Sequence, residues 1–384
     1  MHIPRYSELD ETQERIRFLP LDGMHVITGP PGTGKSVLAV CRHELLKDDD
    51  RDPTLVTFSN LLSQYIHDPD VKDPLANITL SEVNTKTFHS WMWKFWRDNF
   101  KQRPPQIEPY VHDWDRIMAE MNKLGRVEGT ALVIDEGQDL PKPFYSFLGY
   151  LKADLTIFVD DNQSISDNPT YLLDMCDHLE VEMDEVTRIK KNYRNHLQIW
   201  NLAKRFFTET TSGIPDAPSK DDGEVIYRHY DSKDETLERI KIDSENDETA
   251  DIGVFLPTAA EVYDYWKQLT YKLRNSEYDT RRKDNLPQFY MGKNGARRIS
   301  EKNNGEGFVN GEVPLINFEK GHILVTTYES AKGLEFDRVY IPSLQILNPP
   351  AFAMDDDGTL KKFYVLTSRA RTYLELSHHG PGDT

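Results

Sequence analysis

Residues 29–36 place the strongest constraint on how this chain folds. They read Gly-Pro-Pro-Gly-Thr-Gly-Lys-Ser, between an apolar run at 25–28 that is typical of a buried strand and an amphipathic run from Ser36 that is typical of a helix. A glycine-rich turn in that setting directs backbone N–H groups and a helix N-terminus at one anion. We therefore interpret the segment as a phosphate-binding loop (P-loop) rather than as a glycine-rich turn without a ligand.

The charge balance limits the kinds of partner that the chain can have. The formal net charge is −18 over 384 residues, with 29% charged and 38% hydrophobic residues. Such a chain can bury real cores, and its acidity argues against a protein that coats nucleic acid in general. It leaves room for a motor on DNA or RNA, provided that a local basic strip makes the contacts.

Cysteine use and hydropathy predict the compartment. Cys41 and Cys176 lie far apart, show no zinc spacing, and are expected to be buried small residues in a reducing compartment. The first residues lack an apolar signal core, and no run of 18 apolar residues occurs. We expect a soluble, cytoplasmic protein without a membrane partner.

Short apolar runs alternate with amphipathic segments along most of the chain. This alternation predicts an α/β protein with mainly parallel sheets flanked by helices, and the runs are too many for one sheet. We place one lobe at 1–185 and a second at 186–384. Two stretches break the alternation: 91–125 is aromatic and helical, and 275–318 is an insertion or long loop. The expected strands are 24–28, 54–58, 131–135, 155–160, 225–230, 252–256, 323–327 and 339–342.

Two adjacent carboxylates follow the apolar run at 131–134. A buried strand that ends in Asp135 and Glu136 delivers both to the sheet edge where the P-loop lies. Asp135 suits Mg²⁺, which Ser36 of the P-loop would also bind, and Glu136 suits the activation of an attacking water. Read alone, the pair could be ordinary surface acids; together with the P-loop it predicts hydrolysis of a phosphoanhydride, with Lys35 on the phosphates.

Hydrolysis of that kind also needs positive charge on the γ-phosphate. Arg194 and Arg369 are the candidates, each of which could instead be a surface arginine. They lie in the short segments 191–195 and 364–370.

Eight short motifs stand in one order between residues 9 and 371. They read Leu-Asp-Glu-Thr-Gln at 9–13, Thr-Phe-Ser-Asn at 57–60, Thr-Phe-His-Ser at 87–90, Asp-Glu-Gly-Gln-Asp at 135–139, Asp-Asp-Asn-Gln-Ser-Ile at 160–165, Asn-Tyr-Arg at 192–194, Thr-Tyr-Glu-Ser-Ala-Lys-Gly-Leu-Glu-Phe at 327–336 and Tyr-Val-Leu-Thr-Ser-Arg-Ala at 364–370. In kind and in order they resemble the motifs of superfamily-1 DNA helicases of the UvrD/Rep/PcrA type.

The resemblance implies two RecA-like P-loop lobes that bind ATP and Mg²⁺. It implies that Gln13 reads the adenine, Glu335 contacts the ribose, and Arg194 and Arg369 act as arginine fingers. The implied nucleotide-binding set is Gln13, Gly29, Pro30, Pro31, Gly32, Thr33, Gly34, Lys35, Ser36, Gly333 and Glu335. The implied catalytic set is Lys35, Asp135, Glu136, Gln163, Arg194 and Arg369, with Ser36 and Asp135 on the metal.

The resemblance also implies single-strand binding across both lobes, which requires exposed rings for stacking and donors for phosphates. Core packing is the alternative for each aromatic residue, and we favour it for Trp91, Trp93 and Trp96. The implied contacts to nucleic acid are Phe58, Asn60, Phe88, His89 and Tyr328.

The family's two inserted subdomains are mostly missing, which makes this a compact form. The main expectation is an ATP-dependent helicase or translocase, stimulated by single-stranded DNA, moving 3′→5′ and monomeric in isolation. Single-stranded RNA is the alternative nucleic-acid partner. The second hypothesis is an ATPase switch that controls a partner protein in a phage-defence or mobile-element system, with little unwinding. A nucleotide-binding scaffold without catalysis is disfavoured by the intact set of charged residues.

Overall fold

The computed structural model describes residues 8–57, 63–64, 83–164, 169–276, 286–308, 315–318, 321–344 and 357–380. The chain divides into two compact units, which we call the P-loop unit and the second unit. The P-loop unit holds residues up to 191 together with 209–216, and the second unit holds 192–208 and 217 onward. The sequence placed the boundary between residues 185 and 186 and did not anticipate the return of 209–216.

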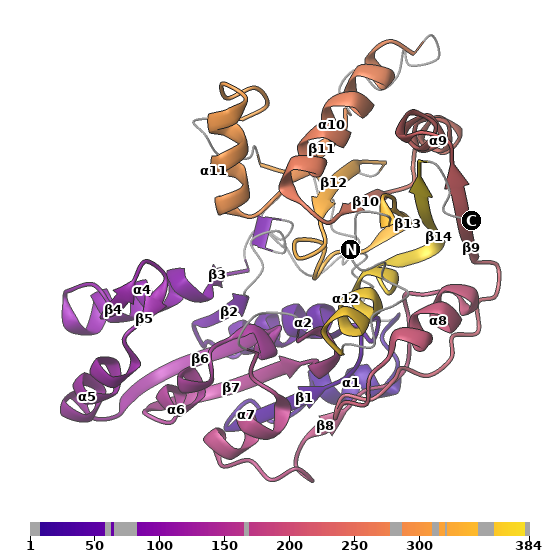
Figure 1. Cartoon of the computed structure of the whole chain (residues 1–384). Helices are drawn as coiled ribbons and strands as arrows, with labels where there is room; N and C mark the ends of the chain where they lie inside the picture. Colours follow the sequence, from indigo (N-terminus) through magenta and orange to yellow (C-terminus); the bar gives the residue numbers. More distant parts are fainter. Residues whose placement is uncertain are drawn as a thin grey trace. The chain divides into compact units, whose positions relative to one another are not determined.

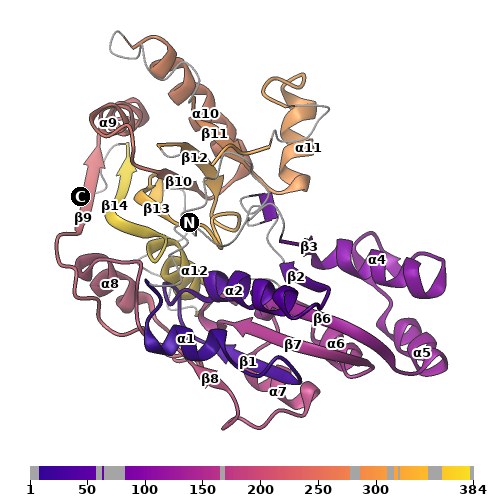
Figure 2. The same ribbon diagram turned by 180° about the vertical axis from the view of Figure 1, so that it is seen from behind.

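The P-loop unit is built on a six-stranded parallel sheet in the order β3-β2-β6-β7-β1-β8. Figures 1 and 2 show α1 and α2 on one face of this sheet and α6 and α7 on the other. The strands are β3 (Thr85–Thr87), β2 (Pro53–Thr57), β6 (Val127–Asp135), β7 (Leu151–Val159), β1 (Met24–Thr28) and β8 (Thr187–Arg188). The helices are α1 (Glu11–Arg17), α2 (Lys35–Asp48), α4 (Phe88–Phe100), α5 (Trp114–Leu124), α6 (Lys142–Leu148) and α7 (Leu172–Leu179), with short 3-10 turns at η3 (Gly137–Asp139) and η4 (Asp161–Gln163).

The second unit repeats this plan with a parallel sheet in the order β11-β12-β10-β13-β14-β9. Helix α9 packs against α10, and α8 packs against α12. The strands are β11 (Gln288–Tyr290), β12 (Ile323–Thr327), β10 (Ile252–Leu256), β13 (Phe336–Ile341), β14 (Ala370–His379) and β9 (Glu224–Tyr230). The helices are α8 (Leu197–Ala203), α9 (Lys233–Asn246), α10 (Ala259–Arg274), α11 (Lys293–Lys302) and α12 (Asp357–Thr367), with the 3-10 turn η5 (Lys204–Phe206) after α8.

Each sheet forms because its central strands are apolar on both faces. All five residues of β10 and all five of β12 are buried, as expected for strands covered by helices on both sides of a parallel sheet. Each unit has a separate apolar core: one holds Val26, Ile134 and Ile157, and the other holds Val254 and Val325. The predicted α/β class with two mainly parallel sheets is therefore confirmed.

All eight strands expected from the apolar runs are present, and the strands that were missed have polar or very short sequences. β14 is missed because it carries Glu375 and Ser377 in a buried strand; Tyr230 and Tyr373 donate hydrogen bonds to the two Glu375 carboxylate oxygens at 2.8 and 2.7 Å. The stretch 91–125 is helical as expected, but it also contains the antiparallel hairpin β4 (Gln106–Glu108) and β5 (Val111–His112).

A smaller expectation, that the two cysteines are buried, is also met. Cys41 and Cys176 are both buried and free. Within the described ranges, no helix is long and apolar enough to span a bilayer.

Candidate nucleotide site

The order of strands in the P-loop unit explains why the predicted hydrolytic residues meet. β7 lies between β1 and β6 in the sheet. The P-loop follows β1, Asp160 follows β7, and Asp135 ends β6. Because the carboxyl ends of parallel strands share one edge, the three segments converge there, which is where open α/β sheets bind ligands.

The P-loop adopts backbone angles that suit glycine. Gly32 and Gly34 have φ angles of 84° and 83°, and Gly34 is the residue that caps α2. A Cβ atom on Gly29 would lie 2.4 Å from the Ile189 side chain. The Thr33 hydroxyl donates to the Pro30 carbonyl at 2.8 Å and closes the turn. The glycines are therefore required by the turn itself, and a turn of this kind before a helix N-terminus is a common anion-binding arrangement.

Lys35 is the first residue of α2, and its ammonium group is already held by three acceptors. Nζ donates to the carbonyl oxygens of Gly29 and Pro30 at 2.6 and 3.0 Å, and it forms an ion pair with Asp160 Oδ2 at 3.0 Å. Only 6% of the Lys35 surface is exposed. An arriving phosphate would therefore replace one anionic partner with another, without the cost of burying a new charge.

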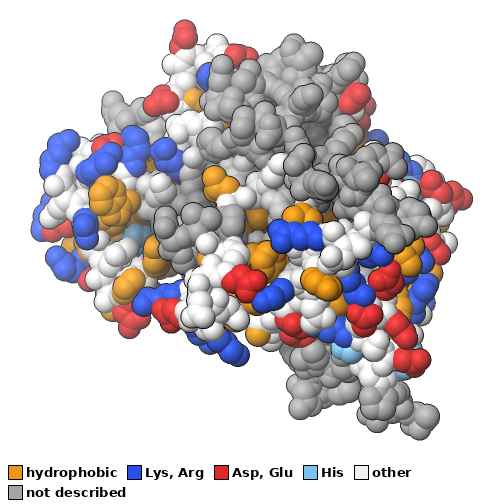
Figure 3. All heavy atoms as spheres, turned by 90° about the horizontal axis from the view of Figure 1, so that it is seen from above, with side chains coloured by type: hydrophobic (Ala, Val, Ile, Leu, Met, Phe, Trp, Pro, Cys, Tyr) orange, Lys and Arg blue, Asp and Glu red, His pale blue; other side chains and the backbone are white. Residues whose placement is uncertain are grey.

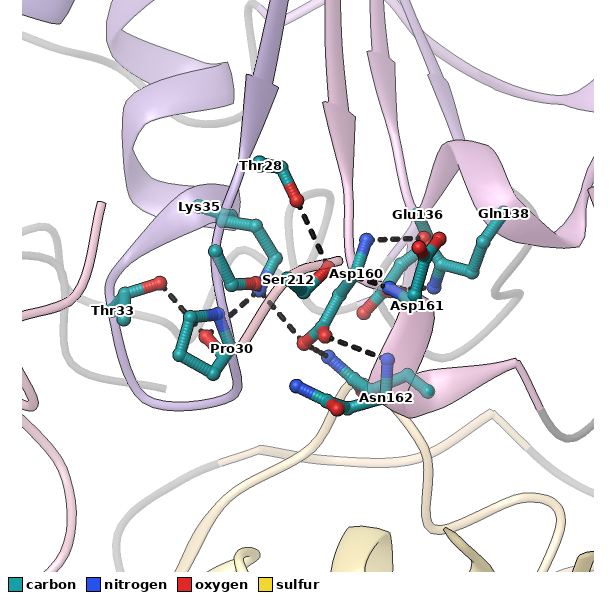
Figure 4. Close-up of polar contacts among 12 residues, drawn as sticks. Thr28, Pro30, Thr33, Lys35, Glu136, Gln138, Asp160, Asp161, Asn162 and Ser212 are labelled. Carbon is teal, nitrogen blue, oxygen red and sulfur yellow. Dashed lines mark hydrogen bonds and ion pairs between the residues drawn. The ribbon is translucent and has the colours of Figure 1, made fainter. Parts of the chain in front are cut away.

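Asp160 connects the residues that the sequence singled out (Figure 4). Its Oδ2 accepts a hydrogen bond from Gln163 Nε2 at 2.7 Å as well as from Lys35. Its backbone N–H donates to Gln138 Oε1 at 3.0 Å, and Gln138 Nε2 donates to Glu136 Oε2 at 2.5 Å. Lys35, Gln163 and Glu136 thus belong to one buried network.

Sequence reasoning missed Asp160 and Gln138 as residues of this site. Both are 0% exposed. Both stand inside motifs that the sequence analysis quoted, at 160–165 and 135–139, so the signal was present. What it lacked was the pairing of strands, which brings the two motifs within hydrogen-bond distance.

The surroundings of Asp135 suit a carboxylate that binds a cation. Burial, and secondarily the charge of Glu136, raise the pKa of Asp135 to about 7, while the Ser36 hydroxyl and the Lys35 ammonium act to lower it. Both carboxylate oxygens are buried, and neither has a full hydrogen bond to any described residue. Such an orphaned carboxylate beside a hydroxyl is the donor set that suits Mg²⁺.

Glu136 occupies a strained backbone position. Its φ angle is 57°, in the left-handed region that residues other than glycine rarely adopt, and it is 4% exposed. Outliers of this kind cost roughly 1–3 kcal/mol and cluster at functional sites. The bond from Gln138 Nε2 fixes the position of the Glu136 carboxylate.

Gln13 lies beside the P-loop, as its proposed adenine contact requires. It is the third residue of α1, where it forms a capping box with Asp10: each side chain accepts a hydrogen bond from the other's backbone N–H. A Cβ atom on Gly34 would lie 2.9 Å from Gln13 Nε2. The capping box therefore holds the amide of Gln13 against the turn before α2.

The second unit brings together three of the residues that the sequence assigned to it. Arg194 Nε forms an ion pair with Glu335 Oε2 at 2.9 Å, and Nη1 donates to the Ser368 carbonyl at 3.4 Å. Arg194 and Glu335 keep 15% and 13% of their side-chain surface exposed. Gly333, two residues before Glu335, has a φ angle of 80° and forms the turn before β13.

Arg369 lies deeper than Arg194 and is 1% exposed. Its guanidinium donates to the carbonyls of Val365 and Leu334 at 3.0 and 3.3 Å, and to Ser368 Oγ at 3.3 Å. These bonds join the end of α12 to the turn before β13. In this conformation Arg369 stabilises its own unit.

The residues proposed to contact nucleic acid divide into three groups. Phe58 and Asn60 lie outside the described residues. Phe88 and Tyr328 are each 2% exposed, so their rings lie in the core rather than on a surface. His89 is half-buried, with its ring centroid 5.3 Å from that of Tyr110.

An exposed basic face on α4 was not expected. Trp91 and Trp96 are buried as predicted, but Trp93 is 41% exposed. Arg97 lies over the Trp93 ring at 5.4 Å, Lys94 is exposed on the same helix, and Lys101 is exposed at the residue that follows the helix. Asp98 lies among these cations and forms ion pairs with Lys94 and Arg97 at 2.8 and 3.5 Å. Figure 3 shows Lys and Arg side chains gathered around an apolar side chain at the end of the P-loop unit where α4 lies. We call Trp93, Lys94, Arg97 and Lys101 the basic α4 face.

Two family models match the chain. Residues 13–169 match an AAA domain, and residues 252–380 match a UvrD-like helicase C-terminal domain. No curated protein matches the sequence. The first match contains the P-loop and the Asp135–Gln163 network, and the second contains Glu335 and Arg369. With two RecA-like lobes, one for each parallel sheet, the chain belongs to the UvrD-like superfamily-1 helicases.

Proposed function

We propose that this helicase-family enzyme is an ATPase stimulated by single-stranded DNA, and that it uses ATP and Mg²⁺ to translocate 3′→5′. The observation that carries the proposal is the buried network that joins Lys35, Asp160, Gln163 and Glu136 at one edge of the sheet. A protein that only binds nucleotide does not need a buried carboxylate such as Glu136 joined by hydrogen bonds to Asp160, the partner of Lys35.

We propose a task for each side chain of this network. Lys35 releases Asp160 and the loop carbonyls, and takes the β- and γ-phosphates. Asp135 and Ser36 would hold Mg²⁺, which supplies charge neutralisation on the phosphate oxygens when bound. Glu136, held by Gln138, accepts a proton from the attacking water, and Gln163 orients towards the γ-phosphate once Lys35 has left Asp160.

We assign nucleotide contacts on the second unit by the same argument. Glu335 is proposed to bind the ribose, beside the turn at Gly333. Arg194 is proposed to stabilise charge on the γ-phosphate, because its guanidinium is partly exposed and exchanges Glu335 for phosphate without being newly buried. Arg369 is proposed for the same role, but it must first give up carbonyl partners in its own unit.

The nucleic-acid contacts rest on exposed groups. The basic α4 face offers a stacking ring and three cations, which outnumber the one carboxylate, Asp98, that pairs with two of them. Exposed rings with cations beside them are the combination that binds single strands without sequence preference. It supplies the local basic strip that a chain of net charge −18 needs. Phe58, Asn60 and His89 stay proposed contacts, and for Phe88 and Tyr328 burial favours core packing.

Steady-state ATPase measurements test the proposal. We expect turnover to rise at least ten-fold with single-stranded DNA, with Lys35→Ala as the inactive control, and a parallel series with RNA decides the strand. Turnover that no oligonucleotide raises, but that a protein partner does, would favour the switch hypothesis instead. Displacement of streptavidin from one end of a biotinylated oligonucleotide reports polarity, and faster release from the 5′ end is expected for 3′→5′ movement.

A further inference from the structure

Residues 209–216, which we call the strap, belong to the P-loop unit although the chain on both sides belongs to the second unit. The chain thus leaves the unit that holds Arg194 after Thr208, lies on the P-loop unit for eight residues, and returns at Ala217. A connection that only joined η5 to β9 would not need this detour. The contacts of the strap show what it reaches.

Ser212 lies at the centre of the strap and is 4% exposed. Its hydroxyl oxygen accepts a hydrogen bond from the Asp161 backbone N–H at 2.8 Å and lies 2.9 Å from Thr28 Oγ1 (Figure 4). Thr28 is the last residue of β1, directly before the P-loop, and Asp161 is the first residue of η4. One hydroxyl group therefore bridges the phosphate-binding loop and the turn that ends in Gln163.

The residues around Ser212 hold the same turn. Thr210 Oγ1 donates to Asn162 Oδ1 at 2.6 Å, and Asn162 Nδ2 donates to the Gly213 carbonyl at 2.7 Å. The Thr211 hydroxyl donates to the Asp161 carboxylate. Asp161 and Asn162 are each 2% exposed, so their polar groups need partners inside the protein.

The strap is itself anchored to the sheet beside the site. Arg188 of β8 donates from Nη1 to the Thr211 carbonyl at 2.6 Å, and the Asp216 N–H donates to the Lys190 carbonyl at 2.7 Å. β8 pairs with β1 through Thr28 and Arg188. The strap, the P-loop strand and the Gln163 turn thus form one hydrogen-bonded assembly.

We propose that the strap is a positioning element for hydrolysis, with Ser212 as its key residue. By fixing η4 against the end of β1, it sets where Gln163 stands relative to phosphates on the P-loop. The inference rests on the proposed ATPase function and adds a residue set to it. Misplacement of a reacting group by about 1 Å costs on the order of 10²-fold in rate, so the effect falls on turnover rather than on ATP affinity.

Three variants separate positioning from general stability. Ser212→Ala removes the bridging hydroxyl, and Ser219→Ala, at an exposed position of the same connection, is the matched control. A double exchange, Thr28→Ser with Ser212→Thr, keeps both hydroxyls and the total volume. We expect Ser212→Ala to lower kcat about ten-fold or more with KM for ATP within about two-fold, and the exchange variant and Ser219→Ala to stay near wild type.

Two kinetic results would overturn the proposal: a Ser212→Ala kcat within two-fold of wild type, or a kcat of the Thr28→Ser, Ser212→Thr double variant that falls as far as that of Ser212→Ala. If Ser212→Ala does not fold, Thr210→Val, which loses only the bond to Asn162, takes its place with the same expectation. Thermal melting of each variant shows whether the rate loss occurs in folded protein.

Hydrogen–deuterium exchange without nucleotide keeps this test separate from the ATPase proposal. The Asp161 N–H should exchange faster in Ser212→Ala than in wild type, because it loses its acceptor. If the wild-type protein hydrolysed no ATP under any condition, the proposed ATPase function would be wrong. The hydrogen–deuterium exchange of the Asp161 N–H would still show whether the strap positions η4. If the Asp161 N–H exchanged at the wild-type rate in a folded Ser212→Ala variant, the proposed positioning role of the strap would be wrong.

Discussion

Lys35 of the P-loop unit and Arg369 of the second unit are both buried cations, but their surroundings differ. Lys35 shares three acceptors, one of which is the Asp160 carboxylate at 3.0 Å. Arg369 donates to two carbonyls and a hydroxyl that belong to the framework of its own unit. Lys35 can exchange one anion for another, whereas Arg369 must leave framework carbonyls behind.

This difference teaches that a buried charge in a matching motif is not enough to assign chemistry. The cost of freeing the cation decides whether it serves the ligand or the fold. A carboxylate partner is replaceable by phosphate, but a buried carbonyl that loses its donor costs about 1–3 kcal/mol. Arg194, with Glu335 as its partner, resembles Lys35 in this respect.

The largest expected effect tests the role proposed for Lys35, the buried cation whose partner is a carboxylate. Lys35→Ala and Glu136→Gln should each lower kcat by about 10³-fold, because charge stabilisation and proton acceptance are lost at the reacting centre. Glu136→Gln can still accept the bond from Gln138, so its fold and ATP binding should persist, as measured by melting and nucleotide titration. Turnover within ten-fold of wild type in either variant would break the assignment.

The aromatic residues give a second contrast between a framework group and an accessible one. Phe88→Ala should cost about 3–5 kcal/mol of stability, because a buried ring leaves a cavity, and it should leave strand affinity of the folded protein unchanged. Trp93→Ala should weaken single-strand binding by about 1–3 kcal/mol without loss of stability. Denaturant unfolding measures the stability of each variant, and fluorescence anisotropy measures its affinity for single strands. If Phe88→Ala weakened strand binding without loss of stability, Phe88 would be a nucleic-acid contact.

The arginine pair tests the framework side of the comparison directly. Arg369→Ala should destabilise the protein by about 2–4 kcal/mol, since two buried carbonyls lose their donor. Arg194→Ala should change stability by less than about 1 kcal/mol and lower kcat at least ten-fold. Melting and steady-state kinetics on both variants decide the matter. A stable Arg369→Ala protein with slowed hydrolysis would show that Arg369 acts on the γ-phosphate, as proposed, and that its bonds to the framework carbonyls contribute little to stability.

His112 offers a buried titratable group that has no proposed chemistry. Burial, and secondarily the charge of His89, lower the pKa of His112 to about 4. Because the folded protein then binds fewer protons than the unfolded chain, stability is full above about pH 6.5 and falls as the pH drops towards 4, by about 1–3 kcal/mol. His112→Phe should flatten that slope in denaturant titrations at several pH values, and an unchanged slope would place its origin elsewhere.

The smallest expected effect tests whether phosphate replaces Asp160 as the anionic partner of Lys35. Asp160→Asn removes the anion that competes with phosphate, so ATP should bind a few-fold more tightly, by about 1 kcal/mol. Turnover should fall at the same time, because Gln163 loses a charged acceptor. Isothermal titration with a slowly hydrolysed ATP analogue measures the first effect. Weaker binding would show that Asp160 holds the loop in shape rather than competing with the ligand.

The nucleotide loop and the acidic strand end could be predicted because their chemistry is local. A glycine-rich turn between a strand and a helix, and two carboxylates after an apolar run, each have few structural solutions. Aromatic residues do not share this property, because the same ring suits a core or a stacking surface. Phe88 and Tyr328 are buried and Trp93 is exposed, which reverses the expectation for all three.

The strand β14 shows the same limit in the fold. Glu375 and Ser377 make its sequence look polar, yet both are buried because two tyrosines donate to Glu375 from within the sheet. Likewise, the stretch 210–223 contains two prolines and three aspartates, a composition typical of a solvated connection. Residues 209–216 instead pack on the P-loop unit, where they bond to the turn η4.

The amino-acid sequence by itself determined the fold class, the family, and the position of the candidate phosphate-binding loop and of the two carboxylates proposed for hydrolysis, because these depend on patterns within a few positions. Only the tertiary structure decided which buried cation has a carboxylate partner, which rings are exposed, and that Asp160, Gln138 and Ser212 lie at the candidate site. Those properties depend on which segments the sheet places side by side. Pairing of distant strands sets the partners of every buried polar group, and no local pattern records them.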